Sequence, residues 1–109
     1  LKNKGELSEA ASAFRQAVEW HPHSGIARSN LGITLAHLRD FESAEAECLA
    51  AVQSEPGLAL GWHNLGLVYF LQEKNEAAGA FQRAVAINPR LPDACQNLGA
   101  ALFRVGDYQ

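Results

Sequence analysis

The chain has 109 residues, of which 48% are hydrophobic, and a formal net charge of −3 from 9 Lys and Arg against 12 Asp and Glu. This length fits one domain or part of one, and the apolar fraction excludes an intrinsically disordered chain. The slightly acidic balance provides no basic field, so we do not expect nucleic acid or an anionic membrane surface as a partner.

A repeat of 34 and then 33 residues organises the chain. A period of this length is one supersecondary unit that buries its apolar faces by stacking on its neighbours, so the repeat predicts a solenoid. Three independent markers share the spacing. They are the tripeptides that begin at Asn30, Asn64 and Asn97, the prolines Pro22, Pro56 and Pro89, and the alanines Ala10, Ala44 and Ala77.

Each period contains two stretches in which apolar residues recur at helical spacing, as at Trp62, Leu65 and Tyr69. Polar turns separate the stretches, and a proline closes each period because the residue before it is pushed out of helical geometry.

No apolar run approaches the ~20 residues of a membrane span, so we expect no membrane insertion. The pattern predicts an all-α fold with about six helices, at 7–20, 25–38, 42–54, 59–72, 76–87 and 92–105.

Glycine recurs at one helical place in every period, as Gly32, Gly66 and Gly99. Each glycine costs about 1 kcal/mol of helix propensity relative to alanine, so the recurrence needs a reason. We interpret it as close approach of a neighbouring helix, with Phe14, Cys48 and Phe81 filling the space between one helix pair and the next.

The second complete period carries a spaced motif: Trp62-x-x-Leu65-Gly66-x-x-Tyr69, Ala77-x-x-x-Phe81, Ala84 and Pro89. This motif resembles that of the tetratricopeptide repeat (TPR) family. The resemblance implies a right-handed superhelical solenoid of antiparallel helix pairs. It covers the whole chain, 1–109, as a single array with complete repeats at 25–58 and 59–91 and partial repeats at 1–24 and 92–109. The chain also lacks methionine, which we interpret as a sign that it is a segment of a longer protein.

The other periods depart from the motif at a few positions. Arg28 and Cys95 stand at the tryptophan place, Leu35 and Leu102 at the tyrosine place, and Cys48 at the phenylalanine place. Cysteine behaves as a small buried hydrophobe, so we expect both cysteines to lie in the core, too far apart for a disulfide.

No residue pattern in the chain points to catalysis. His21 and His23 flank a turn proline, while His37 and His63 share no nearby cysteine or carboxylate partner for a metal. We interpret all four histidines as solvated. The phosphate-binding, nucleophile and zinc motifs are absent from the sequence, so we expect no enzyme activity and no cofactor.

In the family, the first helix of each pair lines a concave groove in which peptides bind. The resemblance therefore implies a peptide-binding surface on the first helices. Its candidate residues are Asn30, Ile33, His37, Leu60, His63, Asn64, Leu67, Phe70, Asn97, Phe103 and Arg104.

This groove contains a single cationic residue, Arg104. Family members that grip a C-terminal carboxylate use several Lys and Arg residues with Asn, so we expect no such clamp here. The row of Asn30, Asn64 and Asn97 has two interpretations. The amides pair with the backbone of an extended peptide, as in the arrays of O-linked N-acetylglucosamine transferases, or each amide bonds a neighbouring helix.

Three functions follow from these observations. The leading hypothesis is a non-catalytic interaction module, part of a longer TPR protein, that binds a peptide or helical segment of a partner protein. The second is a self-assembling scaffold that associates through exposed terminal repeats. The third is the substrate-recruiting arm of a larger enzyme such as a glycosyltransferase. The residues leave the cellular compartment open.

Overall fold

The computed structural model describes residues 3–107, and this range is folded into six α-helices without any β-strand. The six predicted helices are confirmed, with ends that agree within three residues. None of the helices in this range is long and apolar enough to cross a membrane. The helices are α1 (Lys4–Trp20), α2 (Gly25–His37), α3 (Phe41–Ser54), α4 (Ala59–Leu71), α5 (Glu76–Ile87) and α6 (Ala94–Asp107).

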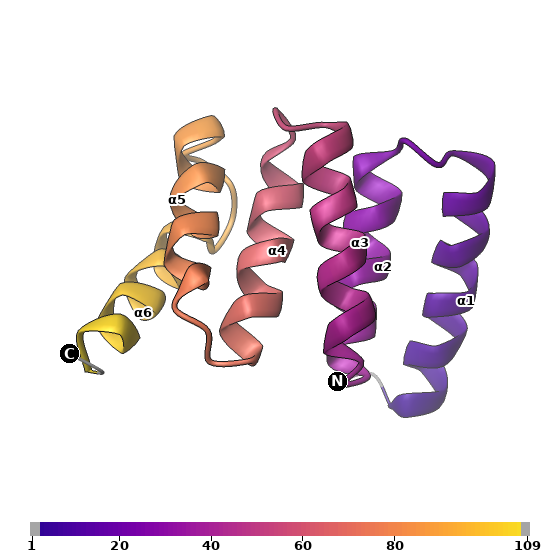
Figure 1. Cartoon of the computed structure of the whole chain (residues 1–109), viewed down its shortest axis with the longest axis horizontal. Helices are drawn as coiled ribbons and strands as arrows, with labels where there is room; N and C mark the ends of the chain where they lie inside the picture. Colours follow the sequence, from indigo (N-terminus) through magenta and orange to yellow (C-terminus); the bar gives the residue numbers. More distant parts are fainter. Residues whose placement is uncertain (1–2, 108–109) are drawn as a thin grey trace.

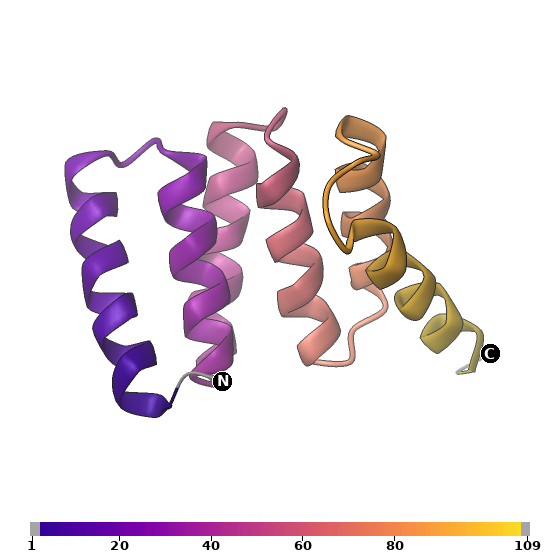
Figure 2. The ribbon, with the colours of Figure 1, turned by 180° about the vertical axis from the view of Figure 1, so that it is seen from behind.

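The helices form two layers in a body of 41 × 29 × 22 Å (Figure 1). Consecutive helices pack as hairpins, with α2 against α3 and α4 against α5. In one layer α2 contacts α4 and α4 contacts α6, whereas α1, α3 and α5 make no contact with one another within residues 3–107. Because α4 contacts both α2 and α6, the layer of these three helices lies on the inner side of the stack. We call the solvent side of α2, α4 and α6 the inner face, which Figure 2 presents to the viewer, and that of α1, α3 and α5 the outer face.

Glycine permits the close packing inside each hairpin at two of the three predicted places. A Cβ atom added at Gly66 would lie 2.6 Å from the ring of Phe81, and one at Gly32 would overlap the Cys48 sulfur. Phe81 and Cys48 are both completely buried. The prediction is wrong for Gly99, where an added Cβ atom would meet no neighbouring heavy atom within 4 Å, because no described segment packs on that side of α6.

The two cysteines differ in burial, because Cys95 lies on the uncovered side of α6 and Cys48 does not. Cys48 lies in the core as predicted, and burial raises the pKa of its thiol to about 12, which makes it chemically inert. Cys95 is exposed, so the prediction of a buried residue there is wrong. Its side of α6 also carries Leu102, which is 47% exposed.

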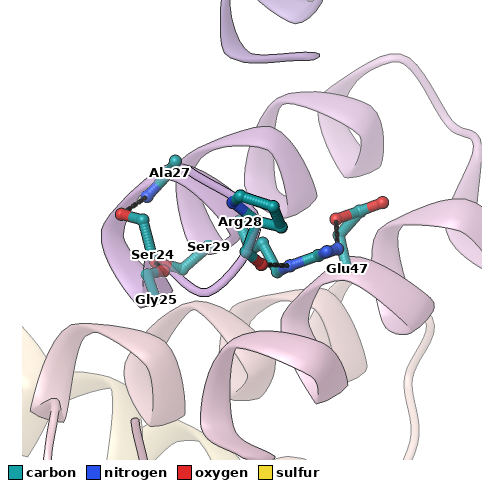
Figure 3. A network of polar contacts seen from close by, with 7 residues as sticks. Ser24, Gly25, Ala27, Arg28, Ser29 and Glu47 are labelled. Atoms are coloured by element: carbon teal, nitrogen blue, oxygen red, sulfur yellow. Dashed lines mark hydrogen bonds and ion pairs between the residues drawn. The ribbon is translucent and has the colours of Figure 1, made fainter. Parts of the chain in front are cut away.

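Polar contacts fix the start of α2 and tie it to α3 (Figure 3). The Ser24 hydroxyl accepts a hydrogen bond from the Ala27 amide at 3.2 Å, which satisfies one of the free N–H groups of the first turn. The Arg28 guanidinium donates to the Pro22 carbonyl at 2.6 Å and to the Glu47 carboxylate at 2.9 Å. Arg28, which stands at the tryptophan place of the motif, therefore joins α2 to the preceding turn and to α3.

Candidate functional site

The inner face carries the eleven candidate residues at different depths. Most of them lie half-buried on α2, α4 or α6. His37 and Phe103 are the most accessible, and the Phe103 side chain is 73% exposed. His63 and Asn64 are buried. The half-buried members are Asn30, Ile33, Leu60, Leu67, Phe70, Asn97 and Arg104.

The three asparagines of the repeat do not have equivalent surroundings. Asn64 is only 5% exposed, and its side-chain amide donates to the Ser29 carbonyl of α2 at 3.1 Å. This bond joins α4 to α2, as in the interpretation that each asparagine bonds a neighbouring helix. Asn97 makes no corresponding bond to the His63 carbonyl in the described part of the chain, and Asn30 is half-buried. Asn30 and Asn97 are therefore half-buried residues whose side-chain amides form no hydrogen bond within residues 3–107.

His63 lies beneath the inner face and is not solvated, contrary to the prediction. Its side chain is 8% exposed, its ring lies 5.6 Å from that of Phe81, and its Nδ1 atom has no hydrogen-bond partner within residues 3–107. Burial lowers the pKa of His63, while the negative charge of Asp93 acts in the opposite direction. Burial between α4 and α5 thus favours the neutral form of the imidazole. No group of three or more His, Cys, Asp or Glu side chains is placed to hold a metal ion among the described residues.

Arg104 forms a fixed contact between α6 and the end of α4. Its guanidinium donates to the Phe70 carbonyl at 2.6 Å and lies 3.7 Å from the centre of the Phe70 ring. The carbonyl belongs to the last turn of α4, where a cation also interacts favourably with the helix dipole. The cation of the inner face is therefore already engaged within the fold, and its contacts with Phe70 help to set the angle between α4 and α6.

Apolar side chains make up most of the remaining inner face. Ile26, at an inward position outside the candidate set, is 53% exposed at the start of α2, and Phe103 is exposed near the end of α6. Ile33, Leu60 and Leu67 lie between them, each half-buried. Ile26 occupies the same helical place in its repeat as Leu60. The arrangement is a row of apolar side chains with half-buried amides and little free charge.

Comparison with known proteins places this architecture in a family. The family model described as tetratricopeptide repeat matches residues 1–59. The cytochrome c-type biogenesis protein CycH of Pseudomonas aeruginosa is 38% identical over 67 residues, which are 61% of this chain and 16% of that protein. The protein O-mannosyl-transferase TMTC3 of Homo sapiens is 32% identical over 109 residues, which are 98% of this chain and 12% of that protein. The chain thus spans only a small part of these curated relatives.

A solved structure shares the fold over nearly the whole chain. The first TPR of Spaghetti (RPAP3), bound to the HSP90 peptide SRMEEVD, has a TM-score of 0.85 and 20% sequence identity. The match covers 94% of this chain and 85% of that one. At this level of identity the likeness establishes the solenoid of helix hairpins.

Proposed function

This chain belongs to the tetratricopeptide repeat family, and we propose that it is a non-catalytic interaction module whose inner face binds a peptide or helical segment of a partner protein. The observation that carries the proposal is the row of accessible apolar side chains that ends at Phe103, 73% exposed, with the amides of Asn30 and Asn97 beside it. Exposed apolar rows mark interaction sites, and aromatic anchors dominate their binding energy.

The chemistry of the inner face favours an internal apolar segment over a chain terminus. Arg104 is its single cationic residue among the inward positions, and its guanidinium is already bonded to the Phe70 carbonyl. The Spaghetti structure contains an HSP90 peptide, and the solenoids are alike, but a terminal carboxylate needs several free cations that this face does not offer. We therefore propose that the ligand is read through its apolar side chains and its backbone.

The proposal is tested by selecting ligands from a phage-displayed peptide library and measuring their affinity by fluorescence anisotropy. Phe103→Ser should weaken binding at least ~10-fold, because an aromatic anchor is lost. The double variant Asn30→Ala/Asn97→Ala should weaken it less, and Asn64 is left intact because its amide holds the fold. Asn75→Ala, an exposed asparagine outside the inner face, is the matched control.

Two outcomes would contradict the proposal. Unchanged affinity in the Phe103→Ser variant, with an intact helical spectrum, would place the ligand elsewhere. A selected peptide that loses affinity when its C-terminus is amidated would indicate a carboxylate clamp, against the charge argument. We expect the amidated and free peptides to bind equally well.

A self-assembling scaffold is a second candidate, favoured by the uncovered side of α6. Gly99 has no neighbour there and Leu102 is 47% exposed, so a second copy could pack on this surface. Light scattering against concentration should detect the association, and Leu102→Glu should abolish it. A strict monomer at high concentration would remove this candidate.

A third candidate is the substrate-recruiting arm of a larger enzyme. Its support is the similarity to the human protein O-mannosyl-transferase over 98% of this chain. The sequence of the full-length protein decides this candidate directly, because a catalytic domain would have to be present in the same polypeptide.

A further inference from the structure

The outer face contains two grooves at equivalent places, one over each of the inner helices α2 and α4. They exist because the outer helices do not touch one another, which leaves the helix beneath partly uncovered. The first outer groove lies between α1 and α3, has a volume of about 310 Å³ and is lined by Arg15, Val18, Glu19, Leu31, Leu35, Ser43 and Glu47. The second outer groove is lined by residues of α3, α4 and α5. It has a volume of about 620 Å³ and is lined mainly by Leu49, Trp62, Leu65, Tyr69, Gly79 and Arg83.

The repeat register explains why the second outer groove is larger. Glu47, which lines the first groove, corresponds to Ala80 in the second, and Ala46 corresponds to Gly79. In the first groove the lining residue Glu47 forms an ion pair with Arg28 of α2 at 2.9 Å. The second groove has no such pair, and its floor is apolar and aromatic.

No close packing contact within residues 3–107 accounts for Gly79. It lies in the first turn of α5, where glycine weakens a helix relative to any ordinary residue. A Cβ atom added there would meet no heavy atom within 4 Å, unlike one at Gly66. Close approach by a second backbone, from outside the chain, is the arrangement that would give this glycine a function.

The rim of the second outer groove carries one cationic and one anionic side chain. Arg83 and Glu76 are both exposed, and neither forms an ion pair within residues 3–107. They lie seven residues apart on α5, or about 10.5 Å along the helix axis. Arg83 also covers Trp62, with its guanidinium carbon 4.5 Å from the ring centre. Leu49, 38% exposed on α3, forms the opposite wall.

We propose that the second outer groove binds one amphipathic helix of a partner protein, laid along α5 with its apolar face against Gly79 and Leu49. The partner helix carries an acidic residue opposite Arg83 and a basic residue opposite Glu76. Oppositely charged residues seven positions apart on one helix match this spacing, since both pairs then lie on the same side. This surface is distinct from the inner face and acts independently of it.

The probe for this proposal is an alanine-based helical peptide of about 18 residues, long enough to form a helix in water. It carries leucines at i, i+3, i+4 and i+7, with Glu and Lys seven residues apart beside them. Titration with the whole chain, followed by fluorescence anisotropy, should give a Kd on the order of 10 µM. A second peptide with Glu and Lys exchanged should bind about threefold more weakly, a difference that high salt removes.

The decisive variant is Gly79→Gln, which fills the groove and improves the helix. It should raise the melting temperature and at the same time weaken binding of the probe ~10-fold or more. Glu19→Gln, a change in the α1 wall of the first outer groove, is the control and should leave the affinity unchanged. Phe103→Ser on the inner face should also leave it unchanged.

Several results would overturn the proposal. They are the absence of probe binding at millimolar concentration, an equal affinity for the Gly79→Gln variant, or a loss of binding in the Phe103→Ser variant. Sedimentation equilibrium tests whether a second copy of this chain occupies the groove. A self-association that Gly79→Gln abolishes would make a second copy of this chain the ligand of the groove, in place of a partner helix.

Discussion

The hairpins α2–α3 and α4–α5 share one backbone plan and differ in the chemistry that holds them. The close glycine contact is made by Cys48 in the first hairpin and by Phe81 in the second. On the outer side, the ion pair of Arg28 with Glu47 is replaced in the second hairpin by Trp62, covered by a cation from α5. The repeat requires small residues at the helix crossings and leaves their neighbours free to vary. Function can therefore differ from one repeat to the next on a constant scaffold.

The largest difference between the hairpins should appear when the side chain opposite each glycine is removed. Phe81→Ala should lower the free energy of unfolding by about 3–5 kcal/mol, because it leaves a large cavity. Cys48→Ala, at the same place in the first hairpin, should cost only about 1 kcal/mol, since it removes a single heavy atom. Urea denaturation followed by circular dichroism measures both values. Equal losses would mean that the second hairpin is not packed as described.

Asn64 and Asn30 should also differ in their contributions to the free energy of unfolding. Asn64→Ala should cost about 1–2 kcal/mol of stability, because a buried hydrogen bond between α4 and α2 is lost. Asn30→Ala should change stability by less than ~0.5 kcal/mol, as is usual for a side chain outside a buried network. The same denaturation experiment compares them. A similar cost for both would show that the two amides have structural roles of equal weight.

His63 should make the second hairpin sensitive to acid. Burial lowers its pKa in the folded protein, so the folded state favours the neutral imidazole. The unfolded chain then binds the proton more readily, and stability should fall as the pH decreases below about 6.5 towards the folded-state pKa. The urea midpoint at pH 7 and pH 5 measures this effect. His63→Leu should reduce the difference between the two midpoints, whereas Asp93→Asn should increase it by removing the charge that favours the protonated form.

The smallest effect belongs to the ion pair of the first hairpin. Glu47→Gln should cost about 0.5 kcal/mol, because both partners are partly exposed and solvent screens their attraction. The difference from the unmodified chain should disappear at high salt, where the Debye length falls to ~3 Å at 1 M. A salt-independent loss would indicate that packing of the side-chain stems, rather than charge, stabilises this contact.

The number of helices and their approximate ends followed from the sequence because both depend on local signals. The spacing of Trp62, Leu65 and Tyr69 repeats on one helix, and turn residues stand beside it in the chain. The close packing at Gly32 and Gly66 could also be predicted. Glycine lowers helix propensity, so its recurrence at one helical place indicates close contact with a neighbouring helix. The candidate residues of the inner face came from the resemblance to the family.

The depth of individual side chains could not be predicted, because it depends on neighbours that are distant in sequence. Cys95 and Gly99 follow the motif yet are uncovered, and His63 is polar yet buried against Phe81. The outer grooves escaped detection as well. Gly79, a helix glycine outside the register of Gly32, Gly66 and Gly99, is a sequence signal for the second of them only.

The sequence by itself determined the repeat, the six helices and the absence of a cationic cluster on the inner positions, because periodicity and charge are properties of the linear chain. Only the tertiary structure decided that Asn64 joins two helices while the side-chain amides of Asn30 and Asn97 form no hydrogen bond within residues 3–107, and that the bonds of Arg104 are already made. Those outcomes depend on the angle between successive hairpins. That angle arises from side-chain packing across the stack, which no local pattern encodes.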